Sequence, residues 1–156
     1  MNPALRALLC CALAILPLAV RPQGLNARSP IMVVRAWARA TPPGASVGGV
    51  YLTIKNSGRA DSLIGVLSPV CGHAEMHSMS MSGGMMRMRP LTTVTIPAHG
   101  EVSFAPDVMH IMLVDLRQPL HQGGHVPVTL TFRAAGPINV DVPIGDFGAD
   151  KPPSGH

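Results

Sequence analysis

Two histidines and two methionines follow one another along this chain at spacings that suit a single metal ion. Ten residues separate His77 from Met88. A further twenty-one residues lead to His110, and Met112 lies two positions beyond it. Thioether sulfur is a soft ligand that selects Cu(I), and imidazole binds most late first-row metals. The apolar run around His110 predicts a strand, on which residues two apart share a face, so one short segment would supply half of a tetrahedral Cu(I) site.

Methionine is concentrated between residues 76 and 88. Six of the ten methionines in the chain lie in this segment, among serines and glycines. That composition is poor for a packed core. Metal capture therefore explains these methionines better than the core-filling role that we expect for Met32 and Met109.

The sequence Ser82-Gly83-Gly84 predicts a turn that makes this segment a β-hairpin. Counting outward from the turn, we expect His77 and Met88 to face each other across the two strands, with Cβ atoms roughly 5 Å apart. The strand that carries His110 and Met112 must then lie beside the hairpin. The candidate auxiliary ligands, chosen by strand parity or by closeness to His77, are Met79, Met81, Met86 and His73.

Short runs of alternating apolar and polar residues, separated by turns rich in glycine, proline and asparagine, cover the chain after residue 28. No segment beyond residue 27 keeps a helical apolar stripe for three turns. Many short strands at this spacing predict an all-β fold, an antiparallel sandwich or barrel. The expected strands are Met32–Ala38, Gly49–Lys55, Ser62–Ser68, Ala74–Met79, Met85–Arg89, Thr92–Ile96, Glu101–Phe104, His110–Leu116, Pro127–Arg133 and Ile138–Pro143.

The first 27 residues have the features of a secretory signal peptide. An arginine precedes an apolar stretch at 8–20 that is too short to span a membrane as a helix. Cleavage after Ala19 or Ala27 is expected, and a retained N-terminal anchor is the alternative. The chain then divides into a signal peptide (1–27), one copper-binding β-sandwich domain (28–146) and a flexible C-terminal tail (147–156).

Charge and cysteine content narrow the range of possible functions further. Without the signal peptide, ten basic residues stand against eight acidic ones, and no basic run or aromatic platform suggests a nucleic-acid partner. Cys10 and Cys11 lie in the signal segment, so the mature domain carries only Cys71 and forms no internal disulfide. We expect Cys71 to be buried, and the alternative is that it lies close to the metal site.

Three segments carry a resemblance to a known family: Ala74-Glu75-Met76-His77, Gly84-Met85-Met86-Arg87-Met88-Arg89 and His110-Ile111-Met112-Leu113. They closely resemble the periplasmic copper(I) chaperones of the PCu(A)C type, whose ligand spacing is that of the two histidines and two methionines described above. The likeness also takes in residues 48–52 and 126–132, so it spans nearly the whole mature chain. This chain departs from many members at Ser78, where they have an acidic residue, and its hairpin is richer in methionine.

The resemblance implies a cupredoxin-like β-sandwich of Greek-key type that binds one Cu(I) through His77, Met88, His110 and Met112. It implies a periplasmic protein that delivers copper to the binuclear copper centre of cytochrome c oxidase. The expected partners are the copper-bearing subunit of the oxidase and a Sco-type thiol assembly protein. Contact with the membrane is expected only through a partner.

Other functions compete with delivery to the oxidase. A periplasmic copper-storage or resistance protein would use the same site. A blue-copper electron carrier needs a cysteine thiolate beside two histidines, and no cysteine follows Cys71. No Ser-His-Asp spacing, phosphate-binding loop or carboxylate pair stands out, so no enzymatic activity is predicted. A plain adhesion sandwich would make the four-ligand spacing a coincidence.

Overall fold

The computed structural model describes residues 29–153, in which all regular secondary structure is β. None of these residues forms a helix that could cross a membrane. Each of the ten expected strands is present, with ends that differ by a few residues. The strands are β1 (Ile31–Arg39), β2 (Val47–Asn56), β3 (Asp61–Leu67), β4 (His73–Ser82), β5 (Met85–Leu91), β6 (Val94–Ile96), β7 (Glu101–Phe104), β8 (Met109–Val114), β9 (His125–Phe132) and β10 (Gly136–Gly145). The signal peptide expected at 1–27, with Cys10 and Cys11, lies outside the described residues.

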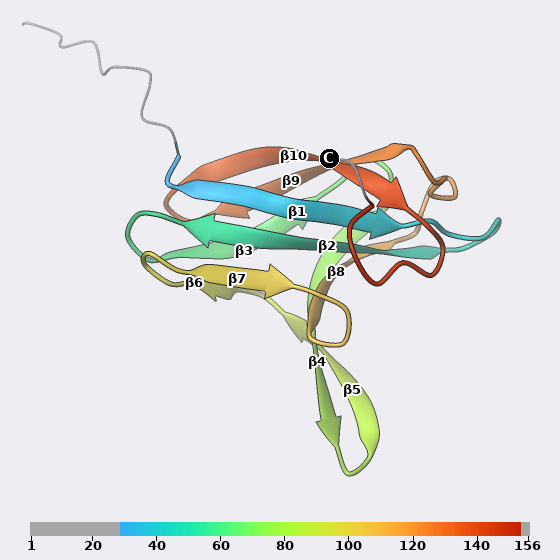
Figure 1. Cartoon of the computed structure of the whole chain (residues 1–156), viewed down its shortest axis with the longest axis horizontal. Helices are drawn as coiled ribbons and strands as arrows, with labels where there is room; N and C mark the ends of the chain where they lie inside the picture. The colour runs from blue at the N-terminus through green and yellow to red at the C-terminus, as the bar shows by residue number, and fades with distance from the viewer. Residues whose placement is uncertain (1–28, 154–156) are drawn as a thin grey trace, which may run out of the picture.

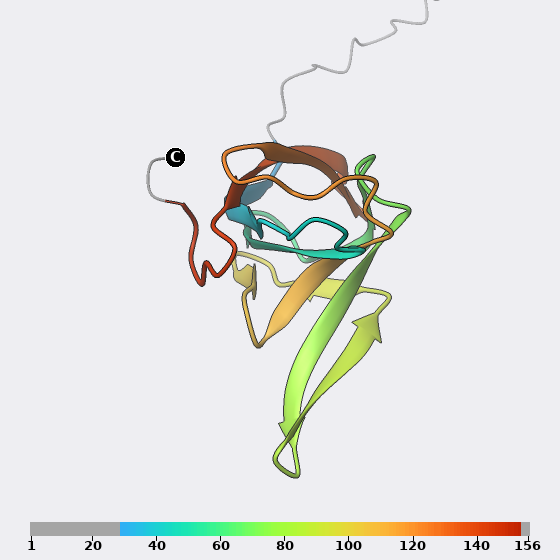
Figure 2. The same ribbon diagram turned by 90° about the vertical axis from the view of Figure 1, so that its right-hand side faces the viewer.

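The strands make two sheets that share one hydrogen-bonded path. One sheet has the order β5-β4-β8-β2-β1, with β7 paired to the other half of β2, and the second has the order β10-β9-β3-β6. A short parallel pairing of β1 with β10, Ala38 to Ile144 and Arg39 to Gly145, joins them. The two sheets curl around a common interior (Figures 1 and 2). The predicted all-β sandwich is confirmed.

Aliphatic side chains from alternate strand positions fill the interior between the sheets. On β8, Ile111 and Leu113 are completely buried in the core cluster. Because successive side chains on a strand point to opposite faces, His110 and Met112 lie on the other face of the same sheet. The packing of β8 into the core therefore fixes which face carries the candidate ligands.

β4 and β5 form a hairpin that projects from the body of the sandwich (Figures 1 and 2). Gly83 and Gly84 have φ angles of 60° and 76°, and a two-residue type I′ turn requires positive φ at both positions. Every residue of β5 except Leu91 is exposed. Pro90 and two arginines occupy this edge strand, which discourages another chain from pairing with it.

The segment after β10 returns along β1. The Arg39 side chain donates from Nε to the Ala149 carbonyl (2.8 Å) and forms an ion pair with Asp150 (3.0 Å). Residues 154–156 lie outside the described part of the chain. The flexibility expected for the tail at 147–156 remains a prediction.

Candidate metal centre

His77 and His110 lie directly opposite each other on the neighbouring strands β4 and β8. Their ring centroids are 5.7 Å apart and the ring planes are nearly perpendicular. Both side chains are buried, at 6% and 8% exposed. A nitrogen from each ring can reach a common metal ion at the roughly 2 Å of a metal–imidazole bond. The hairpin and β8 therefore lie side by side as expected, with the two histidines directly opposite each other.

The pairing of the hairpin differs from the expected one. His77 pairs with Pro90, and Met88 pairs with Met79, so the prediction that His77 and Met88 directly oppose each other is wrong. A pairing of His77 with Met88 needs Ser82 and Gly83 at the centre of the turn. Gly83 and Gly84 occupy those positions instead, and moving the turn by one residue shifts the partner of His77 by two. A register shift of two residues leaves each side chain of β5 on the same face of the sheet.

Met88 therefore stays on the face of His77, as its diagonal neighbour. Diagonal neighbours across two strands are about 7–8 Å apart, within reach of a long side chain. Met112 has the same relation to His77 from the other side, because it pairs with Glu75 on β4. It is half-buried, whereas Met88 is 49% exposed. The structure thus gathers all four predicted ligands on one face of three adjacent strands.

The candidate auxiliary ligands divide into two groups. Met79, Met81 and Met86 share the face of His77 and continue it toward the tip of the hairpin. His73 lies at the other end of β4, about 13 Å along the strand from His77 at the usual rise per residue. Its ring contacts two carboxylates, Glu75 (3.3 Å) and Asp115 (3.8 Å), at the end of β4 away from the hairpin tip.

The Glu75 carboxylate lies against one nitrogen of the His77 ring. Its carboxylate oxygen Oε2 is 3.0 Å from His77 Nε2, and a negative charge there favours a proton on that nitrogen. In a neutral imidazole the lone pair then belongs to Nδ1. Among the described residues, His77 Nδ1 is the buried side-chain nitrogen or oxygen that has no hydrogen-bond partner. An unpartnered buried acceptor costs about 1–3 kcal/mol, so this atom fits the role of a metal ligand.

Glu75 is the functional residue that the sequence interpretation missed. The available signal was its position two residues before His77 on an expected strand, which puts both side chains on one face. Within the described residues, no group of three or more His, Cys, Asp and Glu side chains could hold a metal ion. The other donors predicted on this face are the thioethers of Met88 and Met112.

Aromatic side chains support His110 from the neighbouring strands. The Tyr51 ring lies 6.4 Å from the His110 ring and stacks on Trp37, with centroids 4.6 Å apart. The guanidinium of Arg39 lies over both of these aromatic rings. A cavity of about 350 Å³ opens beside this cluster, and its lining includes His110 and Met112. This cavity therefore gives solvent access to two of the four candidate ligands.

Burial lowers the pKa of His110 below its ordinary value, and the nearby His77 lowers it further. An imidazole must lose its proton to bind a metal. The environment therefore keeps His110 in the form that can act as a ligand.

This shift predicts a pH dependence for the stability of the metal-free protein. The unfolded chain takes up a proton at His110 near pH 6.5, while the folded chain resists it until a lower pH. The free energy of unfolding should therefore decline as the pH falls below about 6.5 and level off below the folded pKa. Thermal unfolding from pH 8 to 5 should show a smaller decline in His110→Asn than in His99→Asn, an exposed control. An equal decline in both variants would contradict the prediction.

Cys71 is buried, as predicted. It belongs to the hydrophobic core cluster, and its thiol donates to the Ser68 carbonyl at 3.6 Å. Burial raises the pKa of the Cys71 thiol, which disfavours the thiolate that a blue-copper site needs. In the described chain it does not join His77 and His110 in a three-ligand cluster. This geometry gives the electron-carrier alternative no thiolate ligand.

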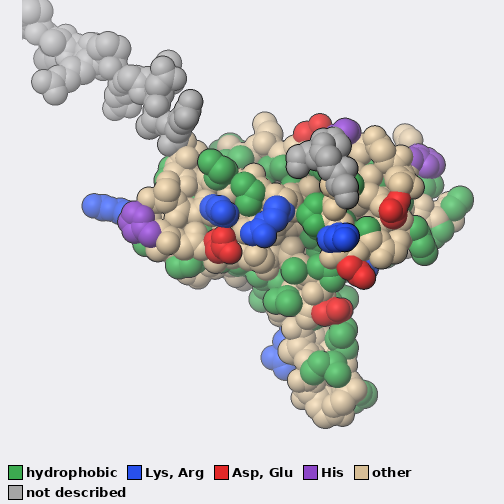
Figure 3. Space-filling model, viewed as in Figure 1, with side chains coloured by type: hydrophobic (Ala, Val, Ile, Leu, Met, Phe, Trp, Pro, Cys, Tyr) green, Lys and Arg blue, Asp and Glu red, His purple; other side chains and the backbone are tan. Residues whose placement is uncertain are grey.

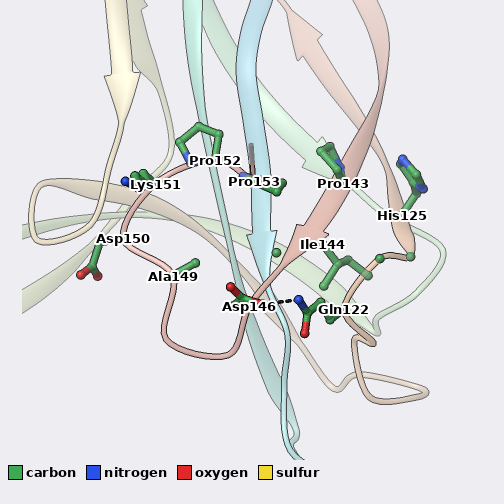
Figure 4. A pocket seen from close by; sticks show the side chains of 13 residues that line it. Gln122, His125, Pro143, Ile144, Asp146, Ala149, Asp150, Lys151, Pro152 and Pro153 are labelled. Carbon is green, nitrogen blue, oxygen red and sulfur yellow. Dashed lines mark hydrogen bonds between the residues drawn. The ribbon is translucent and has the colours of Figure 1, made fainter. Parts of the chain in front are cut away.

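A second cavity, of about 690 Å³, lies between the β9–β10 side of the sandwich and the C-terminal segment. Figure 4 shows it lined by Pro143, Ile144 and the returning segment, with Gln122 hydrogen-bonded to Asp146. None of the four candidate ligands lines it. We therefore assign it no part in metal binding.

Comparisons with known proteins agree with the geometry. A family model described as "Putative lipoprotein LpqE-like" matches residues 31–144. A relative in Leifsonia xyli subsp. xyli, "Putative lipoprotein Lxx21020", is 30% identical over 139 residues, covering 87% of this chain and 82% of the relative. The copper-bound PCuAC domain from PmoF2 superposes with a TM-score of 0.66 and 26% identity, over 78% of this chain and 97% of that domain.

A further solved relative comes from Deinococcus radiodurans. Apo-DR1885 superposes with a TM-score of 0.61 and 28% identity, over 94% of this chain and 97% of that chain. The CuI-DR1885 structure gives a TM-score of 0.55 and 26% identity, over 75% of this chain and 77% of that chain. These similarities confirm the family resemblance that the sequence predicts.

Proposed function

Because this chain belongs to the LpqE-like family and its own structural neighbours include a copper-bound PCuAC domain, we propose that it is a copper(I) chaperone. The proposed ligands are His77, Met88, His110 and Met112. The proposed recipient is the binuclear copper centre of cytochrome c oxidase, loaded directly through its copper-bearing subunit or with a Sco-type thiol protein.

The main support for the proposal is that His77 and His110 form a buried, directly opposed pair and that methionine thioethers lie on the same face of the sheet. The Nδ1 atom of His77 is buried without a partner in the described structure, which supports a ligand role. All four donors are neutral, and soft neutral sulfur favours Cu(I) over Cu(II), which prefers nitrogen and oxygen in tetragonal geometry. Such a site would keep bound copper reduced without any change in protonation of its sulfur ligands.

The position of the site favours transfer over permanent storage. Met88 is half-exposed on an edge strand, and a solvent-open cavity reaches His110 and Met112. A thiolate of a partner could therefore displace the weaker thioethers before the imidazoles. Copper would move by ligand exchange, with no electron transferred and no covalent bond to carbon formed or broken. The proposed role is that of a carrier and not of an enzyme.

The proposed location is the space outside the cytoplasmic membrane, the periplasm in a cell with two membranes. The relatives of this chain are described as lipoproteins, which are exported proteins. The signal peptide expected at 1–27 agrees with export. This location is also where the copper-bearing domain of an oxidase subunit is accessible.

Copper titration followed by transfer tests the proposal. Under reducing, oxygen-free conditions the protein should withdraw Cu(I) from a coloured chelator, and X-ray absorption should show both nitrogen and sulfur neighbours. The loaded protein should then pass Cu(I) to a copper-free oxidase domain, whose visible spectrum appears once an added one-electron oxidant such as ferricyanide removes one electron from the pair of Cu(I) ions. A His77→Asn/His110→Asn double variant is the control; it should not bind Cu(I) tightly and should not load the oxidase domain. Tight binding without transfer to the oxidase domain, alone or with a Sco-type protein, would instead favour the storage or resistance function.

A further inference from the structure

The projecting hairpin carries more thioether ligands than one four-ligand site uses. Two methionine pairs face each other across it, Met79 with Met88 and Met81 with Met86. Successive pairs on one face are about 7 Å apart along a strand. The hairpin therefore presents a ladder of thioethers that leads from its tip to His77.

Both methionine pairs occupy non-hydrogen-bonded positions of the hairpin, where the two strands bring side chains closest together. Pairs alternate between hydrogen-bonded and non-hydrogen-bonded along an antiparallel ladder, and the pair that closes a two-residue turn, here Ser82 with Met85, is hydrogen-bonded. The next pair and every second one after it are then non-hydrogen-bonded, with Cα atoms about 4.5 Å apart and side chains closer together. The methionine pairs fall at these positions.

Two independent observations support this assignment. Pro90, opposite His77, has no N–H and can occupy only a position that needs no donor toward β4. The Met79 N–H points away from β5, because it donates to the Val108 carbonyl at 2.7 Å on the other side of β4. The close approach of the methionine pairs thus follows from backbone hydrogen bonding.

The methionines near the tip lie outside the hydrophobic core cluster. Met81 is 68% exposed and Met86 is 50% exposed. The opposite face of the hairpin carries serines and the two arginines, Arg87 and Arg89. Figure 3 shows this division, with apolar side chains over one side of the projecting hairpin and basic side chains on the other. Exposed thioethers that are paired at close range, with cations kept on the far face, suit capture of a soft cation.

We propose that Met79, Met81 and Met86 form a second, outer Cu(I) site made only of thioethers. It captures copper at the hairpin tip and passes it through Met88 to the inner site at His77 and His110. Each step exchanges one neutral thioether for another ligand, so the charge and oxidation state of the ion stay unchanged. The outer site binds more weakly than the inner one because it lacks imidazole. This inference rests on the proposed function for the identity of the ion.

The test is a Cu(I) titration under reducing conditions, followed by NMR of methionine methyl groups labelled with carbon-13. The wild type should bind a tight equivalent and then a weaker one, and the methyl signals of Met81 and Met86 should shift with the second. The variant Met81→Leu/Met86→Leu should lose the weaker equivalent and keep the tight one. The matched control is Met85→Leu, on the same hairpin and 61% exposed but on the opposite face, and it should keep both.

Failure of this inference is distinguishable from failure of the proposed function. The variant His77→Asn/His110→Asn should lose the tight equivalent while Met81 and Met86 still respond to copper. If the wild type binds one equivalent only, or if Met85→Leu loses as much as Met81→Leu/Met86→Leu, the outer site is refuted while the inner site stands. If the methionine signals respond normally but no variant affects the tight equivalent, the inner ligand assignment fails and the outer site stands.

Discussion

Replacing His110 with asparagine is expected to lower the Cu(I) affinity of the inner site by at least about 100-fold. Loss of a residue that only supports a ligand costs about 10–100-fold in metal affinity, and loss of a ligand should cost no less. The imidazole of His110 is buried next to His77, and its lowered pKa keeps it free of a competing proton. Asparagine offers a shorter side chain with a hard amide oxygen, which Cu(I) does not favour.

The measurement is competition with a Cu(I) chelator at pH 7.5, with circular dichroism to show that the strands remain. His99→Asn is the control, because His99 is exposed on the turn between β6 and β7, outside the three strands that carry the candidate ligands. It should bind copper like the wild type. An affinity of His110→Asn within a few-fold of the wild type, with the fold intact, would remove His110 from the ligand set.

The fold was largely predictable because strand periodicity is a local property. Alternation of apolar and polar residues marks a strand whatever it pairs with, so all ten strands could be placed from sequence. The same alternation put His110 and Met112 on one face before any partner strand was known. The ends of strands were less certain, since they depend on tertiary pairing. β4, for example, extends to Ser82 because the turn contains only Gly83 and Gly84.

The register of the hairpin was not predictable from parity alone. Parity says which side chains share a face, whereas register depends on the number of residues in the turn. The sequence interpretation placed Met88 opposite His77 across the hairpin, whereas the structure gives that place to Pro90. The outer methionine pairs became visible only once the register was fixed.

The surroundings of the histidines were also beyond the sequence. Trp37, Arg39 and Tyr51 come from β1 and β2, which lie far from His110 in sequence and reach it through sheet order. The contact between Glu75 and His77 depends on side-chain conformation. These contacts determine which ring nitrogen carries a proton and how solvent reaches the candidate ligands. The ligand types themselves are apparent from composition and spacing.

Met88→Leu and Met79→Leu form the pair of variants that decides which thioether completes the inner site. Both residues lie on the face of His77 and oppose each other. The family spacing assigns Met88 to the inner site, and we assign Met79 to the outer one. We therefore expect Met88→Leu to lower the affinity of the tight equivalent by about 100-fold and Met79→Leu by less than about tenfold.

Leucine is a suitable replacement because it keeps the apolar volume of methionine and removes only the sulfur. Each variant is titrated with Cu(I) against a chelator, and the tight and weak equivalents are analysed separately. Met79→Leu should weaken the second equivalent, which Met88→Leu should leave in place. In a reversed pattern, Met79→Leu would abolish tight binding. That result would show that Met79, two residues from His77 on β4, is the inner ligand in place of Met88.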